Sequence, residues 1–355
     1  MLTKGPESAR RALVALAVLL AACGGEEPGD PPPAQLTDLT RHAVHVGLDE
    51  SGSAQGALGK VVAARVTDGG RHVVVLDFVA PFVKVFDGRG RLESAFVGTG
   101  GGPAEARHPS ALAVAGDSLV LVADGRNGIT VYDLRGTIRS HARPNGIVPL
   151  AAASCPGEWV LYGPRMDGAS AEARVTPWVH RLRFVGADSV EVRSAWPDTV
   201  PEFVSAGLAY GMVRDGRDVV LWHTGGSRTR GLRVPCGGGK PREVYVGEPS
   251  NRAAPKDGPG GSVQTSVPAG TRAAAGVAAV GQGVVFGERV FVSPEHPRVD
   301  FTLLAGGLAR TLSIAGDFVL NDSRPGDGVL MSTSDPVPQL FLVKPDDFLG
   351  MFPAP

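Results

Sequence analysis

Two strand patterns and two turns recur as a unit in the first half of the chain, and this repeat restricts the fold more than any other feature. Residues 73–77 and 83–87 are followed by Gly90, and the same order returns about 47 residues later as 119–124, 129–133 and a glycine. Each copy indicates a strand, a turn, an alternating strand that ends in an aromatic residue and aspartate, and a glycine turn. Repeats of this length are typical of solenoids and propellers, and the unit accounts for most of a four-stranded blade.

Weaker copies continue to the end of the chain, where they are placed by pattern alone. They lie at residues 158–162 with 178–182, 218–222 with 231–234, 283–287, and 328–331 with 340–343. About 315 residues shared among six copies leave roughly 50 for each, as propeller repeats require. Helical periodicity is absent, and 49 glycines and 29 prolines are typical of a chain that turns often. The predicted fold is all-β: a six-bladed β-propeller over residues 40–355.

Two further segments complete this prediction. Residues 42–46 alternate between polar and apolar, and we expect them to add a strand to the last blade, since closing the ring removes free sheet edges. Residues 248–271 are rich in Pro, Gly, Ser and Lys, which indicates a surface loop between the fourth and fifth blades.

The connection between the first two copies resembles the blade junction of NHL-type six-bladed propellers. It consists of the glycine-rich run 98–102, the stretch Pro103-Ala104-Glu105, and Arg107-His108-Pro109 ahead of the apolar residues 111–114. The resemblance covers residues 98–136. It implies that the glycine-rich connection and the proline turn lead into the innermost strand of a blade.

The N-terminus has the organisation of a bacterial export signal. Lys4, Arg10 and Arg11 precede an apolar run at 12–20, which ends in Leu20-Ala-Ala-Cys23. The run is too short for the roughly 20 apolar residues that cross a bilayer, so we expect residues 1–22 to be removed. The last four residues resemble the lipobox of bacterial lipoproteins. This resemblance implies cleavage before Cys23 and lipid attachment to the Cys23 sulfur. The residues around Arg10 and Arg11 fit the twin-arginine export motif poorly, which favours the general secretory route.

The residues after Cys23 are expected to form a tether. Residues 24–37 are dominated by Gly, Pro, Glu and Asp, a composition that stays extended because it buries little apolar surface. Segment 23–39 would therefore hold the propeller off the membrane, with the acyl chains as the anchor. Because Gly24 follows the cysteine, the lipoprotein resemblance implies the outer membrane if the source has two membranes.

Charge and cysteine content limit the possible partners. The formal net charge is −1, and Lys and Arg are scattered, so the chain lacks the basic surface that nucleic-acid binding requires. Besides Cys23 there are Cys155 and Cys236, each at an expected strand end. Export permits a disulfide between them, but the sequence does not bring them together, and we expect two unpaired thiols.

Four aspartates stand at expected strand ends beside turns, namely Asp77, Asp87, Asp124 and Asp133. A carboxylate there can accept backbone N–H bonds and fix the turn, which is the role we expect. The alternative is Ca²⁺ binding at the axis, as in the gluconolactonase-like propellers. Such sites need six to eight oxygen ligands, whereas this chain is poor in asparagine.

Histidines occur in four different copies, at His108, His180, His223 and His296. A ring of imidazoles near the axis would suit Zn²⁺, as in the peptidyl-hydroxyglycine lyases, which are NHL propellers. These histidines do not share one position within the repeat, so we expect side chains at strand edges and neither metal nor cofactor. Sequence motifs of serine hydrolases, zinc proteases and phosphate-binding loops are also absent.

The function that these observations favour is a membrane-anchored binding module for a peptide, glycan or protein. Arg107 and His108 precede an expected inner strand and are the candidate binding residues at the entrance to the axis. The alternative is a Ca²⁺- or Zn²⁺-dependent hydrolase or lyase with its site at the axis.

Overall fold

The computed structural model describes residues 40, 43–47, 56–144, 146–164, 179–195, 210–225, 228–249, 271–293, 296–324, 328–333 and 338–354. All of them belong to one compact unit, Ala34–Pro355. The predicted signal peptide 1–22, Cys23, the tether to residue 39 and residues 250–270 of the predicted loop lie outside the described residues.

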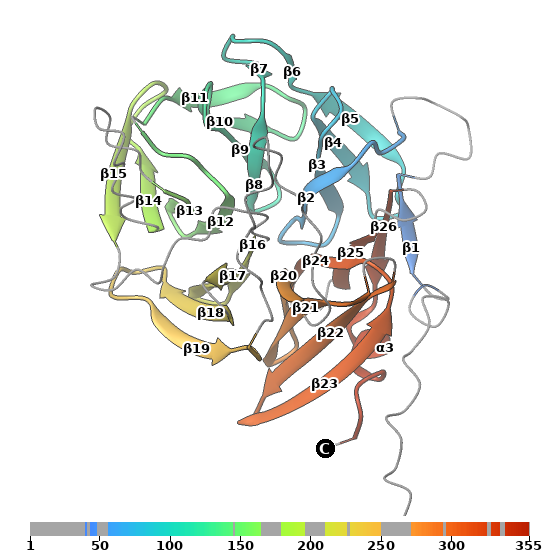
Figure 1. Ribbon diagram of the computed structural model, residues 1–355. Coiled ribbons are helices and arrows are strands. Elements are labelled where there is room, and N and C mark those ends of the chain that lie inside the picture. Colours follow the sequence, from blue (N-terminus) through green and yellow to red (C-terminus); the bar gives the residue numbers. More distant parts are fainter. Residues whose placement is uncertain are drawn as a thin grey trace, which may run out of the picture. The chain divides into compact units, whose positions relative to one another are not determined.

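Four separate sheets, each of four antiparallel strands, follow one another along the chain. The first contains β2 (Val61–Val66), β3 (His72–Asp77), β4 (Val83–Asp87) and β5 (Leu92–Phe96), and the second contains β8 (Pro109–Ala115), β9 (Leu119–Asp124), β10 (Gly128–Asp133) and β11 (Ile138–Ala142). The third contains β12 (Ala151–Cys155), β13 (Glu158–Tyr162), β14 (Val179–Phe184) and β15 (Val190–Ala195), and the fourth contains β16 (Tyr210–Asp215), β17 (Asp218–Gly225), β18 (Arg228–Pro235) and β19 (Arg242–Val246). In Figure 1 the first strand of each sheet lies near a common axis and the last lies outside, which is the arrangement of propeller blades.

A further sheet has eight strands in the order β1-β26-β25-β24-β20-β21-β22-β23. Their bounds are β1 (Val44–Val46), β20 (Thr271–Val280), β21 (Gly283–Ser293), β22 (His296–Ala305), β23 (Leu308–Ala315), β24 (Phe318–Arg324), β25 (Gly328–Thr333) and β26 (Gln339–Val343). The prediction of six separate blades is therefore wrong: four blades are separate, and eight further strands share one sheet.

One glycine explains this difference. Gly276 in β20 pairs in parallel with Leu320 in β24, and this pairing joins the two halves of the eight-stranded sheet. Gly276 has a φ of 92°, and a Cβ placed on it would lie 1.8 Å from the Leu320 carbonyl oxygen. Only glycine permits so close an approach in this conformation, so the two inner strands hydrogen-bond instead of packing through side chains.

The N-terminal strand closes the structure as predicted. Val44 pairs with Leu342 and Val46 with Leu340, so β1 becomes the outermost strand beside β26. Two short strands, β6 (Gly98–Thr99) and β7 (Glu105–Ala106), pair in parallel within the glycine-rich junction that leads to β8. Within the described ranges, no helix has the length and apolar character needed to span a membrane.

The hydrophobic core is divided into clusters that lie between successive sheets. Val74 and Leu76 of the first sheet pack with Leu112 and Val120 of the second, for example, and all four are fully buried. Between the fourth sheet and the next, the Trp222 indole N–H donates to the carbonyl of Gly287 at 2.7 Å. The short helix α3 (Pro345–Leu349) buries Phe348 against the eight-stranded sheet. Each sheet is thus held mainly by its neighbours.

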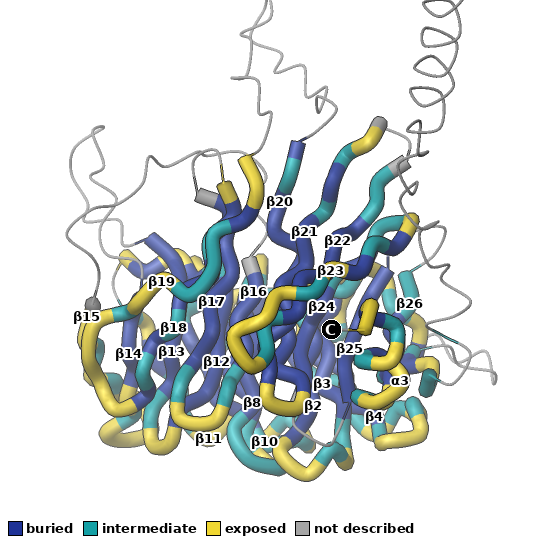
Figure 2. Tube along the Cα trace, turned by 90° about the horizontal axis from the view of Figure 1, so that it is seen from below, coloured by how far each residue is buried: buried dark blue, intermediate teal, exposed yellow. Residues whose placement is uncertain are grey.

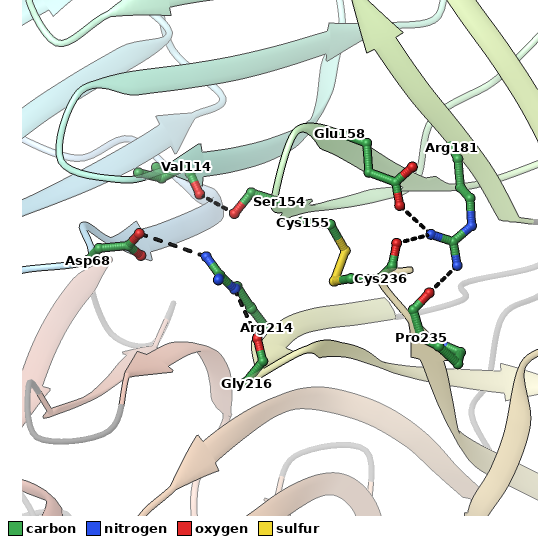
Figure 3. Close-up of a disulfide and its surroundings, with 10 residues drawn as sticks. All are labelled: Asp68, Val114, Ser154, Cys155, Glu158, Arg181, Arg214, Gly216, Pro235 and Cys236. Atoms are coloured by element: carbon green, nitrogen blue, oxygen red, sulfur yellow. Dashed lines mark hydrogen bonds and ion pairs between the residues drawn. A yellow bond between two sulfur atoms is a disulfide. The ribbon is translucent and has the colours of Figure 1, made fainter. Parts of the chain in front are cut away.

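Cys155 and Cys236 form a disulfide, so the expectation of two unpaired thiols is wrong. Cys155 ends β12, the inner strand of the third blade, and Cys236 follows β18 of the fourth blade. The blades bring together cysteines that are 81 residues apart, with their Cα atoms 5.4 Å from each other. Figure 3 shows the bridge between these two strand ends.

The inner strands define two faces of the propeller. We call the side where they begin the start face, which includes residues 59–60, 78–79 and 107–109, and the opposite side the turn face, which includes the turns at 67–71, 156–157 and 236–239. Figure 2 shows the mostly exposed turns along one side of the molecule, and β20, β21 and β22 extending beyond the other strands on the opposite side.

Candidate functional site

Among the described residues, a small cavity lies at the axis of the propeller. It has a volume of about 50 Å³ and is lined by residues of the inner strands β2, β8, β16 and β24 and by residues at the start of β12. Ser110, Ala151, Gly211 and Asn321 are among these residues. Such a volume admits ordered water and excludes a peptide or a sugar ring.

Arg65 fills the axis. Its guanidinium donates to the carbonyl of Asn321 at 2.5 Å, to that of Ala152 at 3.2 Å and to that of Ala64 at 2.8 Å. These carbonyls belong to the inner strands β24, β12 and β2. One buried side chain therefore ties together three blades that are distant in sequence.

The negative charge of Asp322 acts on Arg65 within the core. Burial raises the pKa of Asp322 to about 6, although the Arg65 charge and the backbone N–H groups of Val66 and Ser323 act in the opposite direction. Burial also lowers the pKa of Arg65, while the Asp322 charge opposes that shift. Because desolvation of two charges offsets most of their attraction, we interpret the pair as a device that fixes the inner strands.

An ion pair joins two blades nearer the turn face. Arg214 of β16 lies with its Nη1 atom 3.8 Å from Oδ2 of Asp68, which follows β2. Figure 3 shows this pair beside the disulfide. Both side chains are about one-third exposed, so the contact is screened and contributes little to stability.

The predicted binding residues lie on the start face. The backbone N–H groups of Arg107 and His108 donate to Oδ2 of Asp124 at 2.7 and 2.8 Å, which holds the chain just ahead of β8. Both side chains are exposed, and Ser110, two residues further on, lines the axial cavity. The structure thus places the two residues just ahead of β8 on the start face, and their role in binding stays a prediction.

Asp77 and Asp124 do what the sequence suggested for aspartates at strand ends. Asp77 accepts hydrogen bonds from the backbone N–H groups of Gly59, Lys60 and Val79 and forms an ion pair with Lys84. Asp124 accepts hydrogen bonds from four backbone N–H groups. Burial alone would raise the pKa of each carboxyl, but these donors outweigh it and hold both pKa values below the usual range. Their oxygens are occupied by these donors and fix the start of β2 and β8.

The three candidate histidines with described side chains lie in different surroundings. The His180 ring contacts the Ser194 hydroxyl and the Gly163 carbonyl, each within 2.9 Å. His223 is buried against Tyr162, and burial, together with the Arg230 charge, lowers its pKa to about 4. His108 is exposed, and the His296 side chain lies outside the described residues. No group of three His, Cys, Asp or Glu residues in the described ranges is placed to hold a metal ion.

Two features of the start face were missed by sequence reasoning. Phe78 and Val79 follow β3 and are 65% and 53% exposed, although they continue an apolar run. The Phe78 N–H donates to the Lys60 carbonyl, which fixes this turn beside the start of β2. The signal in the sequence was the stretch Ala80-Pro81, which indicates a turn shortly after the strand that ends at Asp77.

The arrangement of blades is shared with several solved structures. A Bacteroides fragilis protein described as exported has a TM-score of 0.56 at 10% identity, over 88% of this chain and 97% of that one. A member of the DUF4221 family from Bacteroides vulgatus has a TM-score of 0.55 at 10% identity, over 86% and 96%. Hydrazine synthase of Kuenenia stuttgartiensis has a TM-score of 0.50 at 11% identity, over 85% and 81%. The chain is therefore a β-propeller, and similarity at these identities establishes the fold alone.

No protein-family model matches the chain, and no curated protein matches it in sequence.

Proposed function

We propose that this protein is an exported, lipid-anchored β-propeller that recognises a peptide, glycan or protein on its start face. The observation that carries the proposal is the small size of the axial cavity that the described residues line. Arg65 lies at this cavity, which has a volume of about 50 Å³, and this favours binding across the face over binding within a channel.

The start face offers suitable groups for such contact. Phe78 and Val79 present apolar surface, and Arg107 and His108 present hydrogen-bond donors at the next blade junction. Aromatic and arginine side chains contribute most of the energy in many interfaces. Because Asp124 holds the backbone of residues 107 and 108, their side chains are displayed from a rigid turn.

The lipid anchor would hold the exported propeller at a membrane surface. The lipobox ending at Cys23 and the Gly- and Pro-rich composition of residues 24–37 support such anchoring, and Gly24 after the cysteine favours the outer membrane if the source has two membranes. The fold similarity to a Bacteroides protein described as exported agrees with export.

Binding is tested by screening peptides and glycans against the immobilised protein and then measuring the affinity of variants for the strongest binder. We expect Arg107→Ala/His108→Ala to weaken binding at least about tenfold, because the variant loses at least one charged hydrogen bond to the ligand. Its melting temperature should change little. Arg89→Ala, an exposed arginine on the turn face, is the control and should bind normally. Equal affinity of the double variant and the wild type would place recognition elsewhere.

Anchoring is tested separately. The wild type should incorporate labelled palmitate and enter the detergent phase, whereas Cys23→Ser should do neither. Normal palmitate incorporation by Cys23→Ser would contradict lipidation at this residue.

A further inference from the structure

A pocket of about 600 Å³ opens on the turn face, on the opposite side of the propeller from Arg107 and His108. It lies between the third blade and the turn that follows β18 in the fourth blade. Three arginines, two glutamates and three consecutive glycines line most of it. It is far larger than the axial cavity, and neither the proposed recognition on the start face nor the disulfide requires it.

Arg181 lines this pocket, and its positive charge is already neutralised by an ion pair. It pairs with Glu158 and donates to the carbonyls of Pro235 and Cys236, as Figure 3 shows. Its guanidinium therefore serves to attach the turn after β18 to the third blade. The charge available to a ligand comes from the other two arginines.

Arg183 and Arg193 supply that charge. Arg193 lies opposite Arg181, and Arg183 lies opposite Glu191, so the two available arginines are diagonal neighbours on β14 and β15. Cross-strand neighbours at this diagonal are close enough for long side chains to converge. Arg193 is 80% exposed and reaches Glu191 only at 3.9 Å. Among the described residues, no carboxylate lies within ion-pair distance of Arg183.

Gly237, Gly238 and Gly239 line the opposite side of the pocket and add no side chains to it. Gly238 and Gly239 have φ angles of 98° and 110°, so the turn needs glycine at both positions. Gly237 is not strained in this way, and a Cβ added to it would meet no atom within 4 Å. The disulfide and the two carbonyl contacts of Arg181 hold this turn in place.

We propose that this pocket binds a tetrahedral oxoanion, a phosphate or sulfate group, between Arg183 and Arg193. Guanidinium groups match such anions because they offer paired N–H donors together with charge. Glu158 does not oppose the ligand, because Arg181 already neutralises it, and Glu191 leaves one of the two positive charges uncompensated. The group is either a free ion or part of a saccharide.

Calorimetric titration of the full chain with inorganic phosphate, inorganic sulfate and a sulfated disaccharide tests this site. We expect at least one probe to bind with a dissociation constant below about 1 mM, and Arg183→Ala/Arg193→Ala to weaken it at least about tenfold. Gly237→Glu, which adds a carboxylate to the pocket without filling an occupied space, should weaken it similarly. Tighter binding of the disaccharide than of sulfate identifies a saccharide source, and equal binding identifies a free ion.

The matched control is Arg89→Ala/Arg135→Ala, which removes two exposed arginines from the same face in the first two blades. It should bind every probe as the wild type does. The proposal is overturned if no probe binds at 10 mM, or if this control loses as much affinity as the pocket variants, since binding would then reflect general surface charge.

The disulfide adds a further expectation. Reduction frees the turn that carries Gly237, so the affinity for the best probe should fall, while melting curves verify that the reduced protein stays folded at the titration temperature. Unchanged affinity in the folded, reduced protein would overturn the role of the disulfide in forming this pocket.

Discussion

The backbone of Gly276 lies against the carbonyl group of Leu320, and this contact joins the two halves of the eight-stranded sheet. A methyl group at residue 276 would stand 1.8 Å from the Leu320 oxygen, so the strands would have to separate. We expect Gly276→Ala to lower the free energy of unfolding by more than about 3 kcal/mol, the range of severe backbone and packing defects. Urea denaturation followed by fluorescence measures this change.

Gly216 is the matched control for this substitution. It also has a positive φ, 60°, but an added Cβ would meet no atom within 4 Å. Gly216→Ala should therefore lower the free energy of unfolding by only about 1 kcal/mol, because alanine is only mildly unfavourable in the left-handed conformation. Equal losses at the two positions would show that backbone conformation, and not contact with Leu320, is what residue 276 requires.

Asp124 is expected to be a stabilising residue. Its carboxylate accepts the N–H groups of Arg107, His108, Arg126 and Asn127, and alanine would leave these donors without an acceptor. We expect Asp124→Ala to cost about 3 kcal/mol, given 1–3 kcal/mol for each buried group left unpaired and partial rescue by water. Thermal unfolding followed by circular dichroism checks this expectation.

Asp133→Ala provides the comparison. Asp133 also accepts two backbone N–H groups, from Arg135 and Thr137, but at an exposed turn where water can replace the carboxylate. Its loss should lower the melting temperature much less. An unchanged melting temperature for Asp124→Ala would remove the distinction between scaffold residues and the exposed side chains of Arg107 and His108.

The strands of the early blades were predictable because their alternating residues and glycine turns are local signals. Residues 73–77 and 119–124 both form strands that end in an aspartate, as predicted. The joining of the last strands depends on Gly276, one glycine in an alanine-rich run, whose close contact with a strand more than 40 residues away leaves no local pattern. The sequence therefore predicted the fold class correctly and the number of separate blades incorrectly.

The candidate sites were less predictable, because they depend on contacts between distant parts of the chain. Arg65 meets the Asn321 carbonyl across 256 residues, and within its strand pattern it was only a charged residue among apolar ones. Arg107 and His108 were found because they adjoin a recognisable junction. The pocket around Arg183 arises only when two blades and a disulfide come together.

The disulfide between Cys155 and Cys236 should contribute strongly to stability. It closes a loop of 81 residues, and loop-closure entropy gives up to about 4.5 kcal/mol for such a length. We expect Cys155→Ser/Cys236→Ser, or a reducing agent, to lower the urea midpoint accordingly. A thiol assay on the denatured, unreduced protein should find neither cysteine reactive; two reactive thiols would contradict the bridge.

His223 should make stability depend on pH. Burial and the Arg230 charge lower its pKa to about 4, below the ordinary 6.5, so the unfolded chain binds a proton first as the pH falls. The contribution is present above pH 6.5 and is lost as the pH falls toward 4, by roughly 3 kcal/mol. Urea titrations at pH 7 and pH 4.5 should show that, on this acidification, the wild type loses stability relative to His223→Gln by about this amount. An equal change in both proteins would mean that His223 is protonated as readily in the folded protein as in the unfolded chain.

Asp322 should act in the opposite direction over nearly the same range. Burial raises its pKa to about 6 from the ordinary 3.8, so between these values the folded protein holds a proton that the unfolded chain has released. This contribution is present below pH 3.8 and is lost as the pH rises through 6, by roughly 3 kcal/mol. In the wild type it offsets much of the change due to His223.

Asp322→Asn removes this ionisation while keeping an oxygen that can accept the Val66 N–H. The variant should therefore gain stability relative to the wild type as the pH rises from 4 to 7, by roughly 3 kcal/mol, because only the wild type has to ionise a carboxyl beside Arg65 in the closed axis. Free energies of unfolding measured at half-unit pH steps give the difference between the two proteins directly. A difference that stays constant from pH 4 to pH 7 would show that Asp322 ionises with an ordinary pKa, and that the axis around Arg65 is more hydrated than its 50 Å³ cavity indicates.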